Sequence, residues 1–557
     1  MKKRKILSVI LSVSLIAGTF IGCGSSSKET GATSSSGKMD TSPITLEFFN
    51  CDASQDMPFT DDVAEKIKEI TGVTLKISHP VAGDTQSIPL MIASGDYPDL
   101  IFAKGDTGKL IDAGAIIPLD DYIDKKGANL KTLYGDQIER LRYSEKDPSI
   151  YTVGTYGVET KIYAPDGTMQ IQNAVLKDLG YPEIKTLKDY ENAIRTYKEK
   201  YPEINGQKTI GMSLMASDWR WLITCGNIAG AVAGIPDDGQ FKIDDETQKA
   251  TYKFQLPEVK EYIKWLNHLN AEGLLDPESF TQDDSTYRGK LDRGVVLGIS
   301  DAKWGYESSM KNLINNGNEE ATFAPLPVTI NEIYKDQSLK DYGFSGGNGI
   351  GISKSCENKE RAFEFLDWLA SDEAQVLLNW GIEGKHYTVE NGVRKFLPEI
   401  QEQKNTDKDF AHNTGIGNYI YPFPQRGNAA KDSTGNYYSP DTIDSYKVNY
   451  NTAEKETIAA YGKDSWCDFF PQPDELETSK HGQAWQYNIP SDSDMAIIQK
   501  KADDYVQKAV TQAILGKEED FDAAWDKIQS ILNSYGIDKV NQGMTDLTKE
   551  RIKLWNK

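Results

Sequence analysis

The sequence has few of the residues that usually carry metal binding and nucleophilic catalysis. It contains only 5 cysteines and 5 histidines among 557 residues. The cysteines show no C-x-x-C spacing, which leaves zinc-finger and thioredoxin-like sites without support. No histidine belongs to an H-E-x-x-H motif, which excludes the common zinc-protease helix. We therefore expect no cofactor and no metal site.

Four of the cysteines lie well beyond the N-terminus, at Cys51, Cys225, Cys356 and Cys467. In an exported protein these four thiols could form two disulfides, but their pairing is not readable from sequence. Buried free thiols are an equally good alternative.

The sequence also lacks a surplus of positive charge. Lys and Arg number 62 against 84 Asp and Glu, which gives a formal net charge of -22 at pH 7. Phosphate backbones and anionic membrane faces attract basic surfaces, so we expect no nucleic-acid partner. The remaining composition, with 38% hydrophobic and 10% aromatic residues, is typical of a globular chain that buries a large core.

The longest apolar run lies at the N-terminus. A basic head at 2–5 precedes an apolar stretch at 6–21, which is too short for an ordinary membrane-spanning helix and is typical of an export signal. Cys23 follows a small residue at its end, as in a bacterial lipobox, where the cysteine becomes lipidated after cleavage. We predict a signal peptide over 1–22, lipidation of Cys23 and a flexible tether over 23–42. An ordinary secretory signal with an incidental cysteine is the alternative.

The chain after the tether switches repeatedly between strand and helix patterns. Strand-like alternation and helical periodicity follow one another at 44–48, 60–72, 73–77, 85–93 and 100–102. Thr60 is the expected N-cap of the first helix, and Gly72 its end. This order predicts a largely parallel sheet covered by helices on both faces. Because ligands bind beyond the carboxyl ends of such strands, Asp52 and Asp106 become candidate site residues.

From Tyr163 onward the pattern is more helical. A strand returns at 295–299 and runs directly into a segment that contains Trp304 and Tyr306. Trp219 and Trp221 open a predicted helix, and the tail after about residue 494 is helical again.

Several segments along nearly the whole chain follow a pattern shared by one protein family. Besides the lipobox, they are Ala93–Leu100, Gly114–Asp120, Leu176–Gly180, Ala362–Gln375 and Gly381–Tyr387. With these segments the chain resembles the family 1 extracellular solute-binding proteins, the substrate-capturing lipoproteins of ABC importers. The similarity is greatest to their large oligosaccharide-binding branch from Gram-positive bacteria.

The resemblance implies an α/β, two-lobed fold like that of periplasmic binding proteins, with the ligand cleft between the lobes and a helical C-terminal extension. Lobe one would contain 43–162 and 325–378, and lobe two 163–324 and 379–557. The implied function is the capture of an oligosaccharide and its delivery to an ABC transporter permease, without catalysis. The protein would be a monomer, lipid-anchored at the extracellular face of the cell membrane.

Clefts for sugars combine aromatic planes, which pack on C–H faces, with polar groups that bind hydroxyls. On this basis we expect ligand contacts from strand-end carboxylates and from aromatic or basic residues in loops: Asp52, Asp106, Trp219, Trp221, Trp304, Tyr306, Trp380, Tyr387, Arg426, Trp466 and Trp485. Trp265, Trp368 and Trp525 lie on amphipathic helical patterns and are expected in the core.

Two segments depart from the family pattern. The usual aromatic-rich stretch before Leu176 is replaced by Met169–Ala174, and the calcium loop seen in some relatives is reduced to Glu203–Lys208. One Glu and one Asn supply too few oxygen ligands for Ca²⁺, so no calcium site is expected there.

Two other functions remain open from the sequence. The ligand could be a peptide or another solute, although the aromatic supply favours a sugar. An exported glycoside hydrolase would need two carboxylates about 5–10 Å apart across a cleft, and a chain with 84 acidic residues always offers candidates for such a pair.

Overall fold

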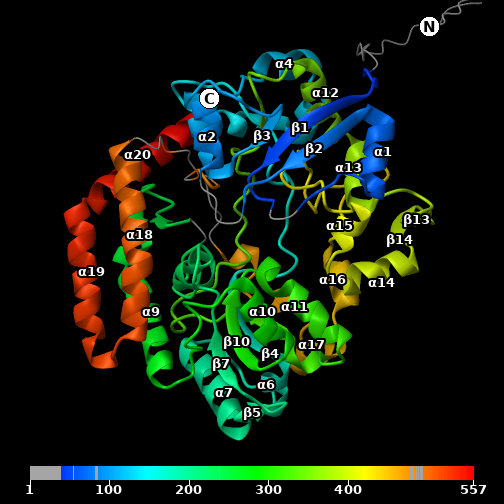
Figure 1. Cartoon of the computed structure of the whole chain (residues 1–557). Helices are drawn as coiled ribbons and strands as arrows, with labels where there is room; N and C mark the ends of the chain where they lie inside the picture. Colours follow the sequence, from blue (N-terminus) through cyan, green and yellow to red (C-terminus); the bar gives the residue numbers. More distant parts are fainter. Residues whose placement is uncertain are drawn as a thin grey trace, which may run out of the picture. The chain divides into compact units, whose positions relative to one another are not determined.

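The computed structural model describes residues 39–53, 56–81, 86–236, 239–476, 482–484, 486, 489 and 493–556. The predicted signal peptide, Cys23, most of the tether and Trp485 lie outside the described residues. Two four-stranded sheets organise the described part, and each carries its own set of helices (Figure 1).

The first sheet is built mainly from the N-terminal part of the chain. Its strands, in spatial order, are β12 (Ile350–Ile352), β3 (Leu100–Phe102), β1 (Ile44–Asn50) and β2 (Val73–Ser78). β1 runs parallel to β2 and β3, and β12 is antiparallel to β3. The connections are α1 (Asp62–Thr71) and α2 (Ser87–Ser94). The predicted order of strands and helices is therefore confirmed.

Helix α1 begins one residue later than the sequence pattern predicts. The N-cap is Asp61 rather than Thr60, and its carboxylate accepts a hydrogen bond of 2.8 Å from the backbone N–H of Ala64. Asp61 also accepts a hydrogen bond from the hydroxyl of Tyr419. A carboxylate satisfies the free N–H groups of a first turn at least as well as a hydroxyl. The helix ends at Gly72, with φ 72°, as expected.

The second sheet and its helices form the second lobe, and the sheet described above belongs to the first lobe. Its strands, in spatial order, are β11 (Phe323–Leu326), β4 (Thr168–Gln172), β10 (Val296–Asp301) and β7 (Ile210–Ser213). β10 is parallel to β7 and antiparallel to β4. Because β11 belongs to this sheet, the expected lobe boundary at residue 325 falls inside a strand.

Strand β4 has no counterpart in the sequence prediction. All five of its residues are buried, including two glutamines. The side-chain amide of Gln170 donates to the backbone carbonyl of Asp301 at 2.9 Å, and that of Gln172 donates to the carbonyl of Gly294 at 3.0 Å. Buried amides that find backbone acceptors are tolerated in a sheet, but they break the apolar alternation that reveals a strand in sequence.

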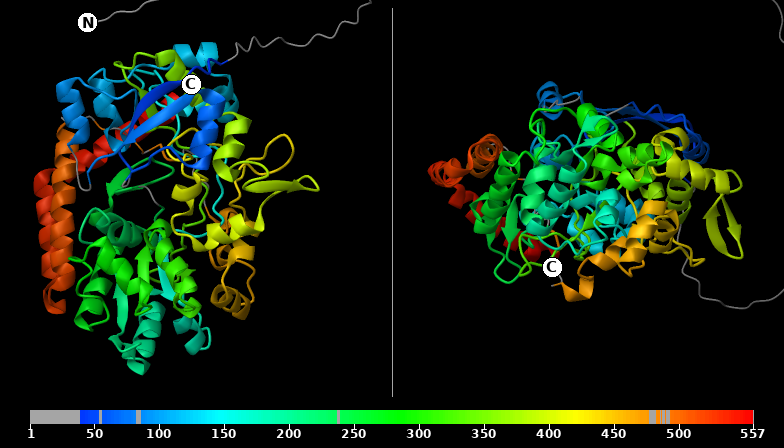
Figure 2. Two further views of the ribbon diagram at one scale, coloured as in Figure 1. Left: turned by 45° about the vertical axis from the view of Figure 1, so that its right-hand side comes forward. Right: turned by 90° about the horizontal axis from the view of Figure 1, so that it is seen from below.

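The C-terminal extension is a group of three long helices beside the second lobe (Figures 1 and 2). They are α18 (Asp494–Leu515), α19 (Phe521–Tyr535) and α20 (Ile537–Trp555), and α18 packs against α9 (Pro257–Ala271). The buried side-chain amide of Asn267 on α9 donates to three carbonyls around the end of α18, those of Ala513, Ile514 and Gly516, at 2.8–3.0 Å. Among the described helices, none is long and apolar enough to cross a membrane.

Helix α20 contacts both lobes. Near its start, Asn541 and Thr545 accept hydrogen bonds of 2.9 Å from the backbone N–H groups of Tyr252 and Ala250 in the second lobe. Near its end, the ammonium group of Lys553 lies 2.5 Å from the carboxylate of Glu145 in the first lobe. The extension therefore connects the lobes as well as enlarging one of them.

The segment that follows α13 (Asp372–Trp380) contacts the first lobe, although the sequence division assigns it to lobe two. Lys385 and His386 approach the Asp62 carboxylate at 2.6 and 3.2 Å. The ring of Phe423 lies 5.3 Å from that of Phe48 in β1. From α14 (Pro398–Thr406), which packs against α11 (Lys303–Asn315), through α16 (Ile443–Asn449) to α17 (Thr452–Ala460), which packs against α6 (Asn173–Asp178), the chain also contacts the second lobe. A periodicity pattern identifies the helices but not the lobe that they cover.

The four cysteines within the described residues are free thiols. Cys225, Cys356 and Cys467 are buried, and Cys51 is half-buried. Burial raises the pKa of Cys225 and Cys356 to about 12. Of the two alternatives left by the sequence, the structure shows free thiols that stay protonated.

Candidate functional site

The carboxyl edge of the second sheet brings together two segments that are distant in sequence. β10 ends at Asp301, and α11 (Lys303–Asn315) begins almost at once and carries Trp304 in its first turn. β7, parallel to β10, ends at Ser213, after which the chain reaches Trp219 and a π-helix at Leu222–Asn227. Because parallel strands end at the same edge, the two segments meet there.

Trp219 and Trp304 form a stacked pair at this edge. Their ring centroids are 5.9 Å apart and the planes are inclined by 16°. Trp219 is 65% exposed and Trp304 is 49% exposed. Together the two rings form an exposed apolar patch, a feature that marks binding sites, and flat aromatic faces suit the C–H faces of sugar rings.

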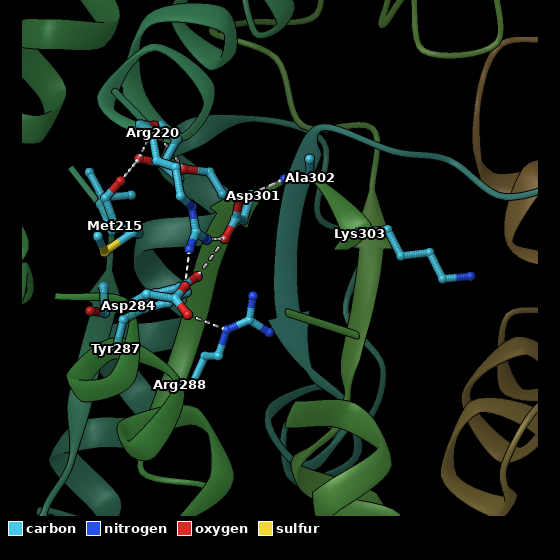
Figure 3. Close-up of polar contacts among 12 residues, drawn as sticks. Met215, Arg220, Asp284, Tyr287, Arg288, Asp301, Ala302 and Lys303 are labelled. Carbon is cyan, nitrogen blue, oxygen red and sulfur yellow. Dashed lines mark hydrogen bonds and ion pairs between the residues drawn. The ribbon is translucent and has the colours of Figure 1, made fainter. Parts of the chain in front are cut away.

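A buried ionic network supports the stacked pair (Figure 3). Arg220 donates a hydrogen bond of 2.6 Å to Asp301, whose side chain is fully buried, and it also binds Asp284 at the start of α10 (Asp284–Asp292). The hydroxyl of Tyr287 donates to Asp301 at 3.1 Å. Burial raises the pKa of Asp301 to about 6, and the nearby Arg220 opposes that rise. The guanidinium of Arg220 lies 5.6 Å from the Trp304 ring centroid, within cation–π range.

Two cavities open on either side of the same edge. One, of about 280 Å³, is lined by the π-helix and by residues 337–342 of the segment that crosses between the lobes. The other, of about 460 Å³, lies between α11 and the later crossing segment that includes α14 (Pro398–Thr406) and α16. Asp166 and Trp304 line both cavities. The carboxylate of Asp166 accepts hydrogen bonds from the backbone N–H groups of Gly167, at 2.8 Å, and of Lys303.

The carboxyl edge of the first sheet carries a second polar and aromatic group. Asp52 follows β1, and Lys104 follows its parallel neighbour β3; their charged groups are 2.9 Å apart. The hydroxyl of Tyr421 donates to Asp52 at 2.9 Å, and burial raises the pKa of this tyrosine well above its usual range. Tyr156, which is 46% exposed, lies 6.4 Å from Tyr421, ring to ring. Asp106, in contrast, forms a local pair with Lys109 at 2.8 Å.

Five other aromatic candidates from the sequence are buried and offer no open face. They are Trp221, Tyr306, Trp380, Tyr387 and Trp466, with exposed fractions of 3–8%. Trp221 stacks on Phe254, and the indole N–H of Trp466 donates to Glu454 at 3.1 Å. Sequence position after a strand or in a loop does not show which way a ring turns. Tyr306 and Trp466 nevertheless contribute to the wall of the larger cavity.

The remaining candidates are placed as follows. Arg426 lies over the Tyr438 ring, 5.6 Å from its centroid, and is not part of either cavity wall described above. Trp368 and Trp525 are buried, as expected, whereas Trp265 is half-buried with its N–H donated to Glu191 at 3.0 Å.

The sequence also contains a G-x-S-x-G pattern at Gly343–Gly347, which matches the nucleophile elbow of α/β-hydrolases. Such an elbow needs a sharp turn from a strand into a helix. Here the pattern lies in a loop that leads into strand β12. The hydroxyl of Ser345 donates to the side-chain carbonyl of Gln483 at 2.7 Å. The pattern therefore lacks the structural setting of a catalytic serine.

The segment 203–208 is a short hairpin of β5 (Glu203–Ile204) and β6 (Gln207–Lys208). Across the part of the chain that the structure describes, no group of three or more His, Cys, Asp or Glu side chains is arranged to hold a metal ion.

Sequence reasoning missed several residues of these edges, namely Lys104, Tyr156, Asp166, Asn227 and Tyr421. Lys104 follows the predicted strand at 100–102, so the rule that selected Asp52 and Asp106 also points to it. Asp166 precedes β4, a strand that the sequence did not predict. Asn227 ends a π-helix, and Tyr421 belongs to a segment far from Asp52 in the sequence. No sequence pattern around either residue predicts a place in the site.

Comparisons with known proteins agree with this architecture. A family model described as bacterial extracellular solute-binding protein matches residues 62–380. The lipoprotein LipO of Bacillus subtilis (strain 168) is 24% identical over 435 residues, which are 76% of this chain and 80% of LipO. The fructooligosaccharide ABC transporter substrate-binding protein FusA of Streptococcus pneumoniae is 25% identical over 339 residues, 58% of this chain and 60% of FusA. The structure of S. pneumoniae FusA in complex with kestose aligns with a TM-score of 0.66 at 19% identity, covering 91% of this chain and 99% of the FusA chain, and so has the same fold.

Proposed function

Because the chain belongs to the bacterial extracellular solute-binding proteins, we propose that it captures an oligosaccharide outside the cell and delivers it to the permease of an ABC importer. The family and the relatives are binding proteins rather than enzymes. A receptor of this kind holds its ligand between two lobes and releases it intact. We propose accordingly that no bond of the ligand is broken.

The observation that carries the sugar assignment is the stacked pair Trp219–Trp304. Both rings are largely exposed at the carboxyl edge of the second sheet, where ligands of α/β folds bind. A sugar ring has apolar C–H faces bordered by hydroxyl groups. It can therefore pack on an indole plane while its hydroxyls reach the carboxylate of Asp166, which lines both adjoining cavities.

The first lobe supplies a complementary polar edge in this proposal. Asp52 accepts hydrogen bonds and Lys104 donates them, and the ring of Tyr156 is exposed nearby. Closure of the lobes on a bound sugar would bring these groups to its second face. The buried rings of Trp221, Tyr306, Trp380, Tyr387 and Trp466 have no open face, so we do not include them as stacking groups.

The relatives support the same ligand class. FusA of S. pneumoniae is by name a fructooligosaccharide-binding protein, and its solved structure holds kestose. The relative LipO is by name a lipoprotein. We propose that this chain is likewise anchored, through Cys23, at the extracellular face of the cell membrane, and that it acts as a monomer.

A thermal-shift screen of residues 24–557 tests the proposed function. The panel contains plant, host and microbial oligosaccharides, with peptides and monosaccharides as controls. A ligand that binds only the folded protein raises its stability by RT ln(1 + [L]/Kd), about 4 kcal/mol for a micromolar binder at millimolar concentration. A shift with one oligosaccharide series, without product after long incubation, is the expected result. A shift only with peptides, or formation of a cleaved product, would contradict the proposal.

A further inference from the structure

The two cavities at the edge of the second sheet share a wall. Trp304 and Asp166 line the smaller cavity, of about 280 Å³, and also the larger one, of about 460 Å³. Any ligand that packs on Trp304 therefore has space on both sides of this residue. A single sugar ring fills only one of these spaces, whereas a chain of sugar rings can enter both.

A residue on the wall of the smaller cavity carries an unsatisfied polar atom. The side-chain oxygen of Asn227 is buried and has no hydrogen-bond partner among the described residues. Asn227 is the last residue of the π-helix Leu222–Asn227 and lines this cavity. An unpaired buried acceptor costs free energy, and π-helical turns occur often at functional sites. A ligand hydroxyl would satisfy this oxygen once the Asn227 side chain turns it toward the cavity.

The larger cavity contains a cation that makes no direct contact with a carboxylate. Lys303 points away from the Arg220–Asp301 network (Figure 3). Its ammonium group lies 4.7 Å from the centroid of the Tyr446 ring. Within the part of the chain that the structure describes, Lys303 forms no ion pair with an acidic side chain. Its N–H groups remain available to donate to ligand oxygens.

Several other charges of the larger cavity are engaged. Lys404 and Asp441 form an ion pair at 2.7 Å. Glu454 accepts hydrogen bonds from the backbone of Asn451, at 2.9 Å, and from the indole of Trp466. Glu307 and Lys311 also line the cavity, and Lys311 lies 3.4 Å from the backbone carbonyl of Asp407. The cavity therefore mixes charges of both signs with aromatic walls, which is not the dense basic lining that polyanions require.

The charge of the whole chain also favours a ligand without negative charge. A formal net charge of -22 repels polyanionic ligands at long range. A sugar without charged groups avoids this repulsion, and its hydroxyls can both donate to Asn227 and accept from Lys303.

We propose that the two cavities form one groove for an uncharged oligosaccharide of at least two sugar units, which passes over Trp304 with one end bonded to Asn227 and the other to Lys303. This inference rests on the proposed function and narrows it. It assigns a direct ligand contact to each of two residues, and it excludes uronic-acid oligosaccharides as the preferred ligand.

The test compares neutral and acidic oligosaccharides of equal length by isothermal titration calorimetry. The probes are fructo-, manno-, xylo- and gluco-oligosaccharides of two to six units, with oligogalacturonates of the same lengths. A neutral series should bind best, with affinity that rises with length until both cavities are filled. Because the ligand carries no charge, adding about 0.5 M salt should leave the affinity within twofold.

Two variants assign the contacts. Asn227→Leu should weaken binding of the best neutral series about three- to tenfold at every length, the effect of one lost hydrogen bond. The melting temperature of the free variant should be unchanged or higher, because an unpaired buried polar atom is removed. Lys303→Met should weaken only the ligands long enough to enter the larger cavity. Lys395→Met, an equal charge change on an exposed strand residue 57% open to solvent, is the control and should bind like the wild type.

The outcomes separate this inference from the function on which it rests. If no saccharide of either charge binds the wild-type protein, the proposed function fails and this inference fails with it. If a saccharide binds but oligogalacturonates bind more tightly, or if Asn227→Leu and Lys303→Met both retain wild-type affinity at every length, the proposed function stands and this inference is overturned.

Discussion

The guanidinium group of Arg220 donates a hydrogen bond of 2.6 Å to the fully buried carboxylate of Asp301. Arg220 lies beyond the end of β7, and Asp301 is the last residue of β10. The pair therefore fixes the segment after one strand to the end of the other. Trp219 directly precedes Arg220 and Trp304 follows Asp301 by three residues, so the same bond holds together the segments that carry the two rings. The proposed sugar platform depends on an interaction beneath it.

Loss of the platform should weaken sugar binding without unfolding the protein. Trp304→Ala removes a ring that is 49% exposed, so the core loses little. Aromatic packing is worth about 0.5–1.5 kcal/mol beyond area burial, and we expect affinity for the oligosaccharide found in the screen to fall at least threefold. Calorimetry measures the change. Ile333→Ala, at a site 86% exposed, is the control, and unchanged affinity of Trp304→Ala would remove this ring from the site.

Loss of Arg220 should destabilise the fold. Arg220→Met leaves the carboxylate of Asp301 buried without its cation, which costs about 3–5 kcal/mol. The double variant Arg220→Met with Asp301→Asn should recover part of this loss, because no buried charge remains. Urea unfolding of the single and double variants measures both free energies. Equal destabilisation in the two variants would show that packing of the arginine, not its charge, holds this edge.

The stability of the C-terminal helices should depend on pH through Asp503. This residue lies on α18 and accepts a hydrogen bond of 2.7 Å from the hydroxyl of Tyr252. Burial raises the pKa of Asp503 from 3.8 to about 7. Between about pH 4 and pH 7 the folded protein therefore holds a proton that the unfolded chain has lost, and stability falls as pH rises through this range.

Asp503→Asn should remove the fall in folding stability between about pH 4 and pH 7. The variant should match the wild type near pH 4 and exceed it above pH 7 by on the order of 1–3 kcal/mol. Melting temperatures measured from pH 4 to pH 8 give the comparison. Asp504→Asn, at an exposed position on the same helix with 60% side-chain exposure, should leave the pH profile as it is. If the melting temperatures of Asp503→Asn and of the wild type change with pH in parallel, Asp503 is ionised throughout this range.

The lipid anchor can be tested apart from ligand binding. Cys23→Ala should move the protein from the membrane fraction to the medium, because a multiply acylated cysteine gives stable anchoring and an alanine accepts no lipid. Cell fractionation and labelling with a fatty-acid analogue measure the change. Labelled Cys23→Ala protein in the membrane fraction would contradict the lipobox assignment.

Chelation should leave the protein unaffected. The hairpin at 203–208 offers Glu203 and Asn205 where Ca²⁺ requires six to eight oxygen ligands. We expect the melting temperature and the sugar affinity to be the same with EDTA and with added Ca²⁺. A higher melting temperature with Ca²⁺ that EDTA reverses would point to a cation site elsewhere in the chain.

Some features of the fold follow from local pattern. The alternation at β1, β2 and β3 and the helical periodicity of α1 predicted the first sheet. Periodicity succeeds here because these strands and helices alternate apolar and polar positions along the chain. β4 was missed because its buried glutamines are satisfied by carbonyls of Asp301 and Gly294, which no local pattern reveals.

The candidate site was only partly accessible from sequence. Position after a strand directed attention to Asp52 and Trp304, which the structure places at the carboxyl edges of the two sheets, because strand ends locate the edge of a sheet. The same reasoning also selected Tyr306, which is 3% exposed. Side chains two residues apart on a helix, such as Trp304 and Tyr306, point to nearly opposite sides. Residue type and approximate position therefore do not determine exposure.

By itself, the sequence determined the export signal pattern, the α/β class, the family resemblance and the aromatic supply for a sugar site, since each is written in local composition, periodicity or contiguous motifs. Only the tertiary structure decided that Trp219 stacks on Trp304, that Arg220 pairs with Asp301 beneath them, and that the oxygen of Asn227 lies unpaired beside the same wall. These relationships join residues far apart in the chain, and they arise because two parallel strands end at one edge of a sheet.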